Sequence, residues 1–220
     1  MVKTVLTDYN AFNERADEII NLKKENNQVR ETILDLKQTI RENNYICLTA
    51  PQIGVNKRIM CINFKGDIRT MINPIIPNST GWMLNREKCP SCENKEYIVP
   101  RNSKIKLMYT TPLGKYETID LMGVAACAAQ YGINVLDGVL LCDFGLELDE
   151  NWDKATEEER DEILHMYLES LDLQEKNVKN DIEEDPETKQ LSDAIKFIES
   201  VQKGETKLDI NSNINNDDNK

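Results

Sequence analysis

VAACAAQYGINVLDGVLL, residues 124–141, is the stretch of sequence that decides the fold. Its alanines leave one face of small side chains, which predicts a tightly packed helix over residues 124–135. Gly132 lies inside this segment and costs about 1 kcal/mol relative to alanine in a helix. Burial must therefore hold the helix, and we expect it near the centre of the protein.

The residues that precede this stretch predict one long helix followed by short strands. An apolar stripe predicts an amphipathic helix over about 27–42, formed by Val29, Ile33, Leu36 and Ile40. Helical spacing of Phe12, Ala16 and Ile19 predicts a shorter amphipathic segment over 12–20. Gly, Pro and Asn separate four expected strands, at 58–64, 70–76, 105–111 and 117–123. Because they do not alternate with helices, we expect an α+β fold with small mixed or antiparallel sheets around the buried helix.

The C-terminal part differs in composition. Thr156 and Glu159 have the spacing of a capping box, which predicts the start of a last long helix. A charged linker follows after about Asn177, and we place a domain boundary there, giving domains of residues 1–177 and 178–220. Within the second domain we expect an amphipathic helix over 187–202 and a polar tail. Its stripe, expected to dock on its own domain or on another chain, consists of Leu191, Ile195, Ile198 and Val201.

Three separated segments carry a resemblance to a known family. They are CLTAPQIGV at 47–55, EKCPS at 87–91 and QYGINVLDGVLL at 130–141. In order and spacing they resemble the three motifs of peptide deformylases, and residues 5–175 are covered by the likeness. The resemblance implies a peptide-deformylase-like fold with a helical extension at its C-terminal end.

The resemblance also implies a metal site whose residues are mostly replaced here. In the family, the Cys of the second motif and two His of the third hold a divalent metal, and a Glu serves the metal-bound water. This chain resembles the family at Gln52 and Cys89, whereas the other motif positions differ: Pro90, Tyr131, Gly132 and Val135. Valine cannot ligate, a phenol is a poor ligand, and Pro90 has no N–H to stabilise an oxyanion. We therefore expect no metal, no cofactor and no enzymatic activity.

The function expected from this pattern is a structural or assembly role through contacts with other protein subunits. A component of a tailed-phage virion is one such setting, and an oligomer is left open. Two alternatives remain: an atypical metal-dependent deformylase or hydrolase, and a peptide-binding module that uses Gln52 and a strand edge beside the old cleft. Trp82 is expected at the edge of that cleft, either packed or as a partner anchor.

Charge and hydropathy limit the classes of partner and the location that we expect. A net charge of −12 argues against nucleic acid. The sequence has neither an apolar run of the roughly 20 residues that a membrane span needs nor an N-terminal apolar signal segment. We therefore expect neither a membrane nor an exported protein, but a location in the cytoplasm or within a virion assembled in the host cytoplasm.

The cysteines and the single histidine offer further candidate sites. Most of the 6 cysteines lie in apolar runs, as Cys142 does, so we expect buried, reduced thiols. Cys89 and Cys92 form a CxxC pair, for which three interpretations remain: an inherited and an incidental thiol, a redox pair, or part of a metal site with Cys47 and Cys127. His165 is expected on the solvated side of the last helix.

Overall fold

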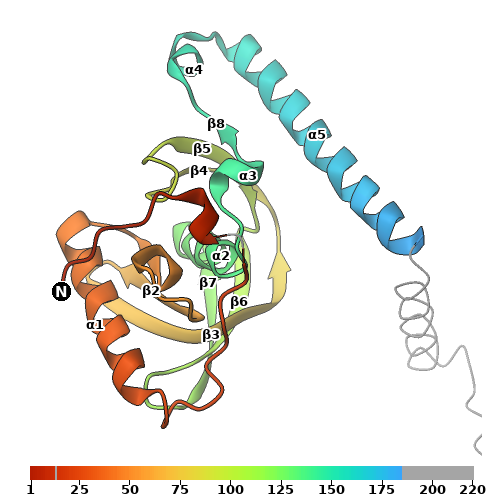
Figure 1. The fold of residues 1–220 in the computed structure, drawn as a ribbon. Helices are drawn as coiled ribbons and strands as arrows, with labels where there is room; N and C mark the ends of the chain where they lie inside the picture. Colours follow the sequence, from red (N-terminus) through yellow and green to blue (C-terminus); the bar gives the residue numbers. More distant parts are fainter. Residues whose placement is uncertain (13, 185–220) are drawn as a thin grey trace, which may run out of the picture. The chain divides into compact units, whose positions relative to one another are not determined.

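The structure is a computed structural model and describes residues 1–12 and 14–184 (Figure 1). The chain divides into two compact units, Met1–Ala155 and Thr156–Lys220. The predicted helix over 187–202, with Leu191, Ile195, Ile198 and Val201, lies outside the described residues. The predicted boundary at 177 stays a prediction.

Two antiparallel sheets form the first unit. The larger sheet has the order β1-β2-β3-β6-β7, with bounds Cys47–Thr49, Ile59–Phe64, Asp67–Thr80, Lys104–Thr110 and Tyr116–Met122. The smaller sheet has the order β4-β5-β8, with bounds Met83–Lys88, Glu96–Arg101 and Leu146–Glu147. β1 and β4 are therefore end strands of their sheets. The pairing of β3 with β6 shifts register around Pro74, which has no N–H for the ladder.

Helix α1 (Asn26–Asn43) covers one face of the larger sheet, as the apolar stripe predicted. The stripe is buried together with Thr32 and Thr39. Asn44 ends the helix in the left-handed conformation, with φ 54°, and donates its N–H to the Ile40 carbonyl. The predicted helix over 27–42 is confirmed within one residue at each end.

Helix α2 (Val124–Leu136) lies near the middle of the first unit (Figure 1). It contacts β1, β2, β6 and β7. Eight of its residues are buried: Ala126, Cys127, Ala128, Ala129, Tyr131, Gly132, Val135 and Leu136. The predicted buried helix is confirmed. Its small side chains let it approach the sheet closely.

The predicted helical segment over 12–20 is wrong. Only a single 3-10 turn forms, η1 (Tyr9–Phe12), and the chain beyond it runs without a helix. Its backbone groups bond to distant segments instead: Ala16 N–H donates to the Leu136 carbonyl and Arg58 N–H donates to the Asp17 carbonyl. The apolar side chains are still buried, because the segment lies across the fold as an irregular strip.

Short elements complete the first unit. A second 3-10 turn, η2 (Pro51–Ile53), follows β1, and two short helices, α3 (Leu141–Phe144) and α4 (Glu150–Lys154), flank β8. The sequence did not single out β4, whose residues are mostly polar and half-buried.

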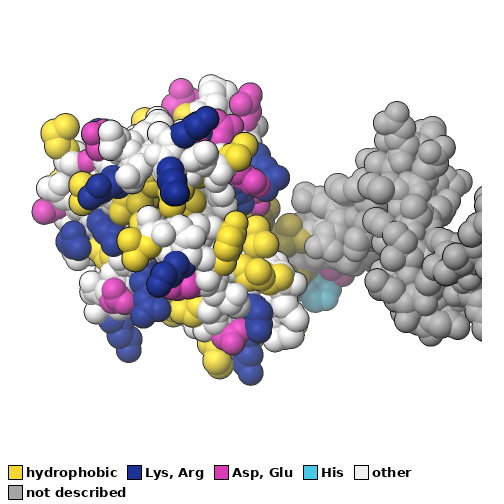
Figure 2. All heavy atoms as spheres, turned by 90° about the horizontal axis from the view of Figure 1, so that it is seen from below, with side chains coloured by type: hydrophobic (Ala, Val, Ile, Leu, Met, Phe, Trp, Pro, Cys, Tyr) yellow, Lys and Arg dark blue, Asp and Glu magenta, His cyan; other side chains and the backbone are white. Residues whose placement is uncertain are grey.

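Charge is unevenly divided between the two units. The first contains 19 Lys and Arg against 20 Asp and Glu, whereas the second contains 8 against 19. Figure 2 shows the two signs mixed over one face of the first unit, with hydrophobic side chains between them. The argument from net charge against nucleic acid therefore applies to the second unit and not to the first.

Within the second unit the structure describes one long helix, α5 (Glu157–Glu184). The capping box is confirmed: Glu159 N–H donates to Thr156 Oγ1 at 3.3 Å, and Thr156 N–H donates to a Glu159 carboxylate oxygen at 2.8 Å. His165 is exposed, with Nδ1 3.5 Å from a Glu169 oxygen, as predicted. None of the helices in the described part of the chain is long and apolar enough to cross a membrane.

Candidate functional site

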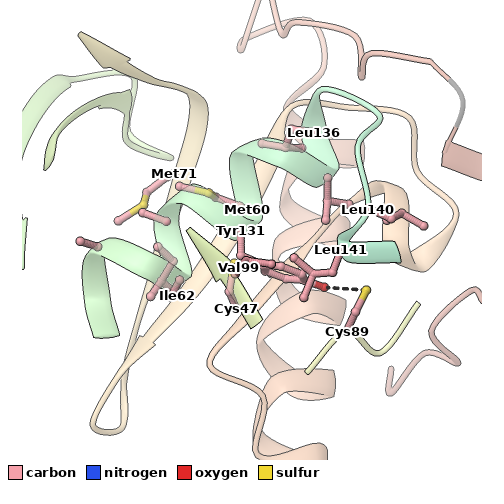
Figure 3. Close-up of a cluster of buried hydrophobic side chains, with 14 of the residues drawn as sticks. Cys47, Met60, Ile62, Met71, Cys89, Val99, Tyr131, Leu136, Leu140 and Leu141 are labelled. Atoms are coloured by element: carbon pink, nitrogen blue, oxygen red, sulfur yellow. Dashed lines mark hydrogen bonds between the residues drawn. The ribbon is translucent and has the colours of Figure 1, made fainter. Parts of the chain in front are cut away.

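Three segments far apart in the sequence meet beside α2. Gln52 comes from η2, Cys89 from the turn that follows β4, and Tyr131 from the middle of α2. Figure 3 shows the Tyr131 hydroxyl pointing at the Cys89 sulfur, among buried apolar side chains. The structure thus brings together the two residues that match the family pattern and the tyrosine that replaces a histidine.

A continuous chain of hydrogen bonds joins these side chains. Thr49 donates to Gln52 Oε1 through its N–H at 3.1 Å and its hydroxyl at 3.2 Å. Gln52 Nε2 donates to the Tyr131 hydroxyl oxygen at 2.9 Å and to Ser91 Oγ at 3.1 Å. The Tyr131 hydroxyl also contacts the Cys89 sulfur, 3.7 Å away, and either group can be the donor. A Tyr131 O–H directed to the sulfur would complete a chain of donors that ends at the thiol.

Cys89 is the most acidic thiol of the group. Hydrogen bonds from Cys92, Tyr131 and the backbone N–H groups of Ser91 and Cys92 lower the pKa of Cys89 to about 7, against the opposing effect of burial. The Cys92 thiol is the largest of these causes. The same bond to Cys89, together with burial, raises the pKa of Cys92. These hydrogen bonds therefore favour the thiolate form of Cys89.

Tyr131 remains a neutral phenol. Burial, followed by the nearby Cys89 and Cys47 thiols, raises the pKa of Tyr131 well above its usual value. The side chain is 6% exposed. It can therefore donate a hydrogen bond to a developing anion but cannot act as a phenolate base at neutral pH.

The residues around α2 do not fit the metal that the resemblance implies. No group of three His, Cys, Asp or Glu side chains able to hold a metal ion occurs among the described residues. Val135 is buried at 1% exposure, and the Tyr131 hydroxyl is already bonded to Gln52. Within the described part of the chain every buried side-chain nitrogen or oxygen atom has a hydrogen-bond partner. The described residues around α2 therefore lack the ligands that a divalent metal requires.

Compared with the family motif, this chain has a smaller side chain in α2 and a larger one in β1. The family motif has Gly before Leu in its first segment and Glu in its third, whereas this chain has Cys47 and Gly132 at those positions. A Cβ added to Gly132 would lie 2.9 Å from Cys47 Sγ and 2.7 Å from Met60 Sδ. The space of a helix side chain is thus filled by sulfur atoms of β1 and β2. The two changes are coupled through packing.

A cavity of about 540 Å³ opens next to this cluster. Its walls come from the end of α1, from β1, from β4 and Pro90, and from α2, including Cys127 and Tyr131. Gln52 and Cys89 are fully buried and are not part of the wall. Tyr131 is therefore the residue that both faces the cavity and belongs to the hydrogen-bonded chain.

Arg101 in β5 bonds to β4 and to α2, two elements that line the cavity. The sequence did not identify it as a site residue. Its guanidinium donates to both Glu87 carboxylate oxygens at 2.8 Å and to Asn134 Oδ1 at 2.5 Å. Glu87 lies in β4 and lines the cavity, and Asn134 lies in α2. This buried pair therefore sets the position of β4 relative to α2. The motif spacing alone carries no signal for it.

The cysteines are arranged differently from the expectation. Cys142 is exposed rather than buried, because α3 presents it at the surface. Its Sγ lies 2.8 Å from Cys92 Sγ, and both thiols are free. Cys47 and Cys127 line the cavity and do not join Cys89 and Cys92 in a metal-binding group. Trp82, which the sequence placed at the cleft edge, is 66% exposed and not part of the cavity wall.

Comparisons with known proteins agree with this fold. The profile of the polypeptide deformylase family matches residues 2–149. A peptide deformylase from Symbiobacterium thermophilum is 30% identical over 149 residues, which cover 66% of this chain and 69% of that protein. Peptide deformylase 1 from Clostridium perfringens is 32% identical, over 55% of this chain and 84% of the relative.

Solved structures of the same family share the fold. A peptide deformylase from Legionella pneumophila has a TM-score of 0.62 at 23% identity, covering 79% of this chain and 98% of that one. A Met-Ala-Ser-bound class I type b peptide deformylase from Acinetobacter baumannii has a TM-score of 0.60 at 22% identity, covering 65% of this chain and 98% of that one. The α+β, deformylase-like fold expected from the sequence is confirmed.

The comparisons correct the expectation of a protein without enzymatic activity. The relatives and structural neighbours are named as peptide deformylases, which are enzymes. Replaced motif residues do not by themselves establish that activity is lost, and nothing in the comparisons supports a phage or virion role. The chain belongs to the polypeptide deformylase family.

Proposed function

We propose that this protein acts on the amino-terminal end of a peptide held in the cavity beside α2, in the reaction class of its relatives. The observation that carries the proposal is the position of the cavity, which is lined by β1 and β4, the end strands of the two sheets. The backbone groups of an end strand can pair with an extended peptide. The Acinetobacter baumannii neighbour described as Met-Ala-Ser-bound supports a peptide as the ligand.

The cavity wall has the mixed character that a peptide end requires. Ile46, Val124 and Ala128 offer apolar surface for a side chain. Asn43, Asn44 and Asn85 offer amide groups that can both donate to and accept from a peptide backbone. Apolar lining with a few convergent polar groups is the usual composition of a ligand site.

Cys89 is the group on which we expect the reaction to depend. Its lowered pKa makes it the most nucleophilic side chain of the hydrogen-bonded cluster. Cys89 is buried next to Tyr131, which lines the cavity, so the Tyr131 ring must move for a substrate to reach the thiol. In a metal-free step the Cys89 sulfur would then attack the carbonyl carbon of an N-formyl group. The C–N bond would break as the amine takes up a proton, and water would then hydrolyse the thioester to formate and free thiol. Tyr131 would donate its hydroxyl hydrogen bond to the carbonyl oxygen as charge develops there.

An assay of N-formylmethionyl-peptide hydrolysis tests this proposal. Formate release should occur with the intact chain, and Cys89→Ala should abolish it. Cys61→Ala is the matched control, because Cys61 packs on the α1 side of the larger sheet and neither lines the cavity nor joins the hydrogen-bonded chain. Metal content should be measured on the same samples, since turnover that follows bound metal and not Cys89 would contradict the thiolate role. Peptide binding without turnover would contradict the reaction and leave a peptide receptor.

A further inference from the structure

Cys92 and Cys142 form a thiol pair that the proposed reaction does not use. Their sulfur atoms are 2.8 Å apart although the residues are 50 positions apart in sequence. A disulfide bond has an S–S distance of about 2.05 Å, so a small approach would join them. The CxxC spacing suggested a Cys89–Cys92 pair, but the close sulfur contact is between Cys92 and Cys142.

Both thiols are held in place by their own segments. The turn after β4 is closed by Cys92 N–H donating to the Cys89 carbonyl at 3.0 Å and by Lys95 N–H donating to the Cys92 carbonyl at 3.0 Å. Across from it, α3 is fixed at its start by Leu140 N–H, which donates to an Asp143 carboxylate oxygen at 2.6 Å. The contact between the sulfurs therefore belongs to two locally closed segments.

The two sulfurs differ in access. Cys142 is exposed, whereas Cys92 is 7% exposed. A small oxidant would thus reach Cys142 first, and the inner Cys92 would stand directly behind it. An accessible thiol next to a resolving thiol is one feature of reversible redox pairs. Burial raises the pKa of Cys142, so the first step is expected to be slower than at a low-pKa cysteine.

We propose that Cys92 and Cys142 form a reversible disulfide that links the turn after β4 to α3, next to the hydrogen-bonded cluster. With a hydroperoxide as oxidant, Cys142 sulfur attacks the peroxide, the O–O bond breaks, and a sulfenic acid and water (or an alcohol) form. Cys92 sulfur then attacks the Cys142 sulfur, the S–O bond breaks, and hydroxide leaves and takes the Cys92 proton as water. The two thiols lose two electrons in total, and the peroxide gains them. A dithiol reductant reverses the reaction by exchange.

The disulfide would join two segments that border the hydrogen-bonded cluster. Cys92 lies in the turn that also contains Cys89, and Cys142 lies in α3. The proposal does not rest on the proposed function, since the disulfide itself does not require catalysis.

Mass spectrometry of the full chain treated with hydrogen peroxide tests the proposal. We expect the mass to fall by that of two hydrogen atoms and a peptide map to link Cys92 to Cys142. Dithiothreitol should restore the original mass. Cys142→Ser should abolish the link, and Cys127→Ser, which alters a thiol outside the pair, should leave it unchanged. A Cys89–Cys92 link, or over-oxidation of Cys142 without any link, would overturn the proposal.

A second measurement follows stability and does not depend on turnover. The melting temperature should rise by roughly 5 °C or more on oxidation, since the bond closes a long loop. This change should be absent in Cys142→Ser. A melting temperature that falls in disulfide-bonded protein would contradict the close approach of the two segments, whatever the outcome of the formyl-peptide assay.

Discussion

The larger sheet has two covered faces, and β2 contributes alternate side chains to each. Ile59 and Cys61 pack with the α1 side, whereas Met60 and Ile62 pack with the α2 side. The α1 side is almost wholly aliphatic, while the α2 side contains Tyr131 and several thiols. One face thus serves mainly stability, and the other combines packing with a hydrogen-bonded cluster next to a cavity. The predictions below test this difference, from the largest expected effect to the smallest.

Truncation on the α1 face should reduce stability without touching the thiol cluster. Leu36 of α1 is fully buried, so Leu36→Ala should lower the free energy of unfolding by about 2–5 kcal/mol. Urea denaturation measures this loss. The disulfide link between Cys92 and Cys142 should still form in the folded variant treated with hydrogen peroxide, and its absence would contradict the proposed separation of the two faces.

Alkaline pH should reveal the buried thiol of the α1 face. Burial raises the pKa of Cys61 to about 11. An acid whose pKa is raised on folding stabilises the protein below its unfolded pKa of about 8.5, and this contribution is lost as pH rises towards 11. Cys61 alone should therefore lower the free energy of unfolding by about 3 kcal/mol between about pH 8.5 and 11.

The variant Cys61→Val should flatten the decline of unfolding free energy between about pH 8.5 and 11. Cys89→Ala is the contrasting variant, because the pKa of Cys89 is lowered and its contribution has the opposite sign. Denaturation series at several pH values measure both slopes. Equal slopes in wild type and Cys61→Val would show that this thiol is not buried as described.

On the α2 face, Gly132→Ala should cost about 1–3 kcal/mol of unfolding free energy, because the new methyl group meets Cys47 and Met60. The same substitution should cost less in a Cys47→Gly background. A double-mutant cycle gives the coupling, expected at about 0.5–3 kcal/mol. Additive effects would contradict the exchange of volume between α2 and β1.

The smallest effect on stability is expected from Tyr131→Phe. Removing the hydroxyl leaves Gln52 bonded to Ser91 and Thr49, so the loss should be about 1 kcal/mol. Cys89 also loses a donor that lowers its pKa. The midpoint of its alkylation-against-pH profile, expected at about 7 in the wild type, should therefore move upward. An unmoved midpoint would remove Tyr131 from the thiol cluster.

Much of the fold could be predicted because its signals are local. The stripe on α1 and the small residues of α2 follow helical spacing, and the capping box at Thr156 needs only a few neighbouring residues. The helix predicted over 12–20 is wrong because the backbone of this segment bonds to distant segments and not to its own turn. Local spacing predicted which of its side chains are buried but not the backbone conformation that buries them.

The candidate site was predicted only in part. The motifs identified Gln52, Cys89 and Tyr131 as positions of interest, but no spacing rule shows that they form one hydrogen-bonded chain. The expectation of a protein without activity treated each replaced motif residue as a loss. It did not consider that the replacements could lower the pKa of the remaining thiol.

The sequence by itself determined α1, α2, the start of α5, the period of the strands and the family, since these depend on neighbouring residues and on ordered motifs. Only the tertiary structure decided which thiols meet. Cys92 contacts Cys142 across 50 residues, and Gln52 contacts Tyr131 across 79. Helix α2, in the stretch 124–141, therefore has a role beyond packing, because it places Tyr131 next to the sulfur atom of a distant segment. Such contacts depend on how the sheets close around α2, and no local pattern encodes them.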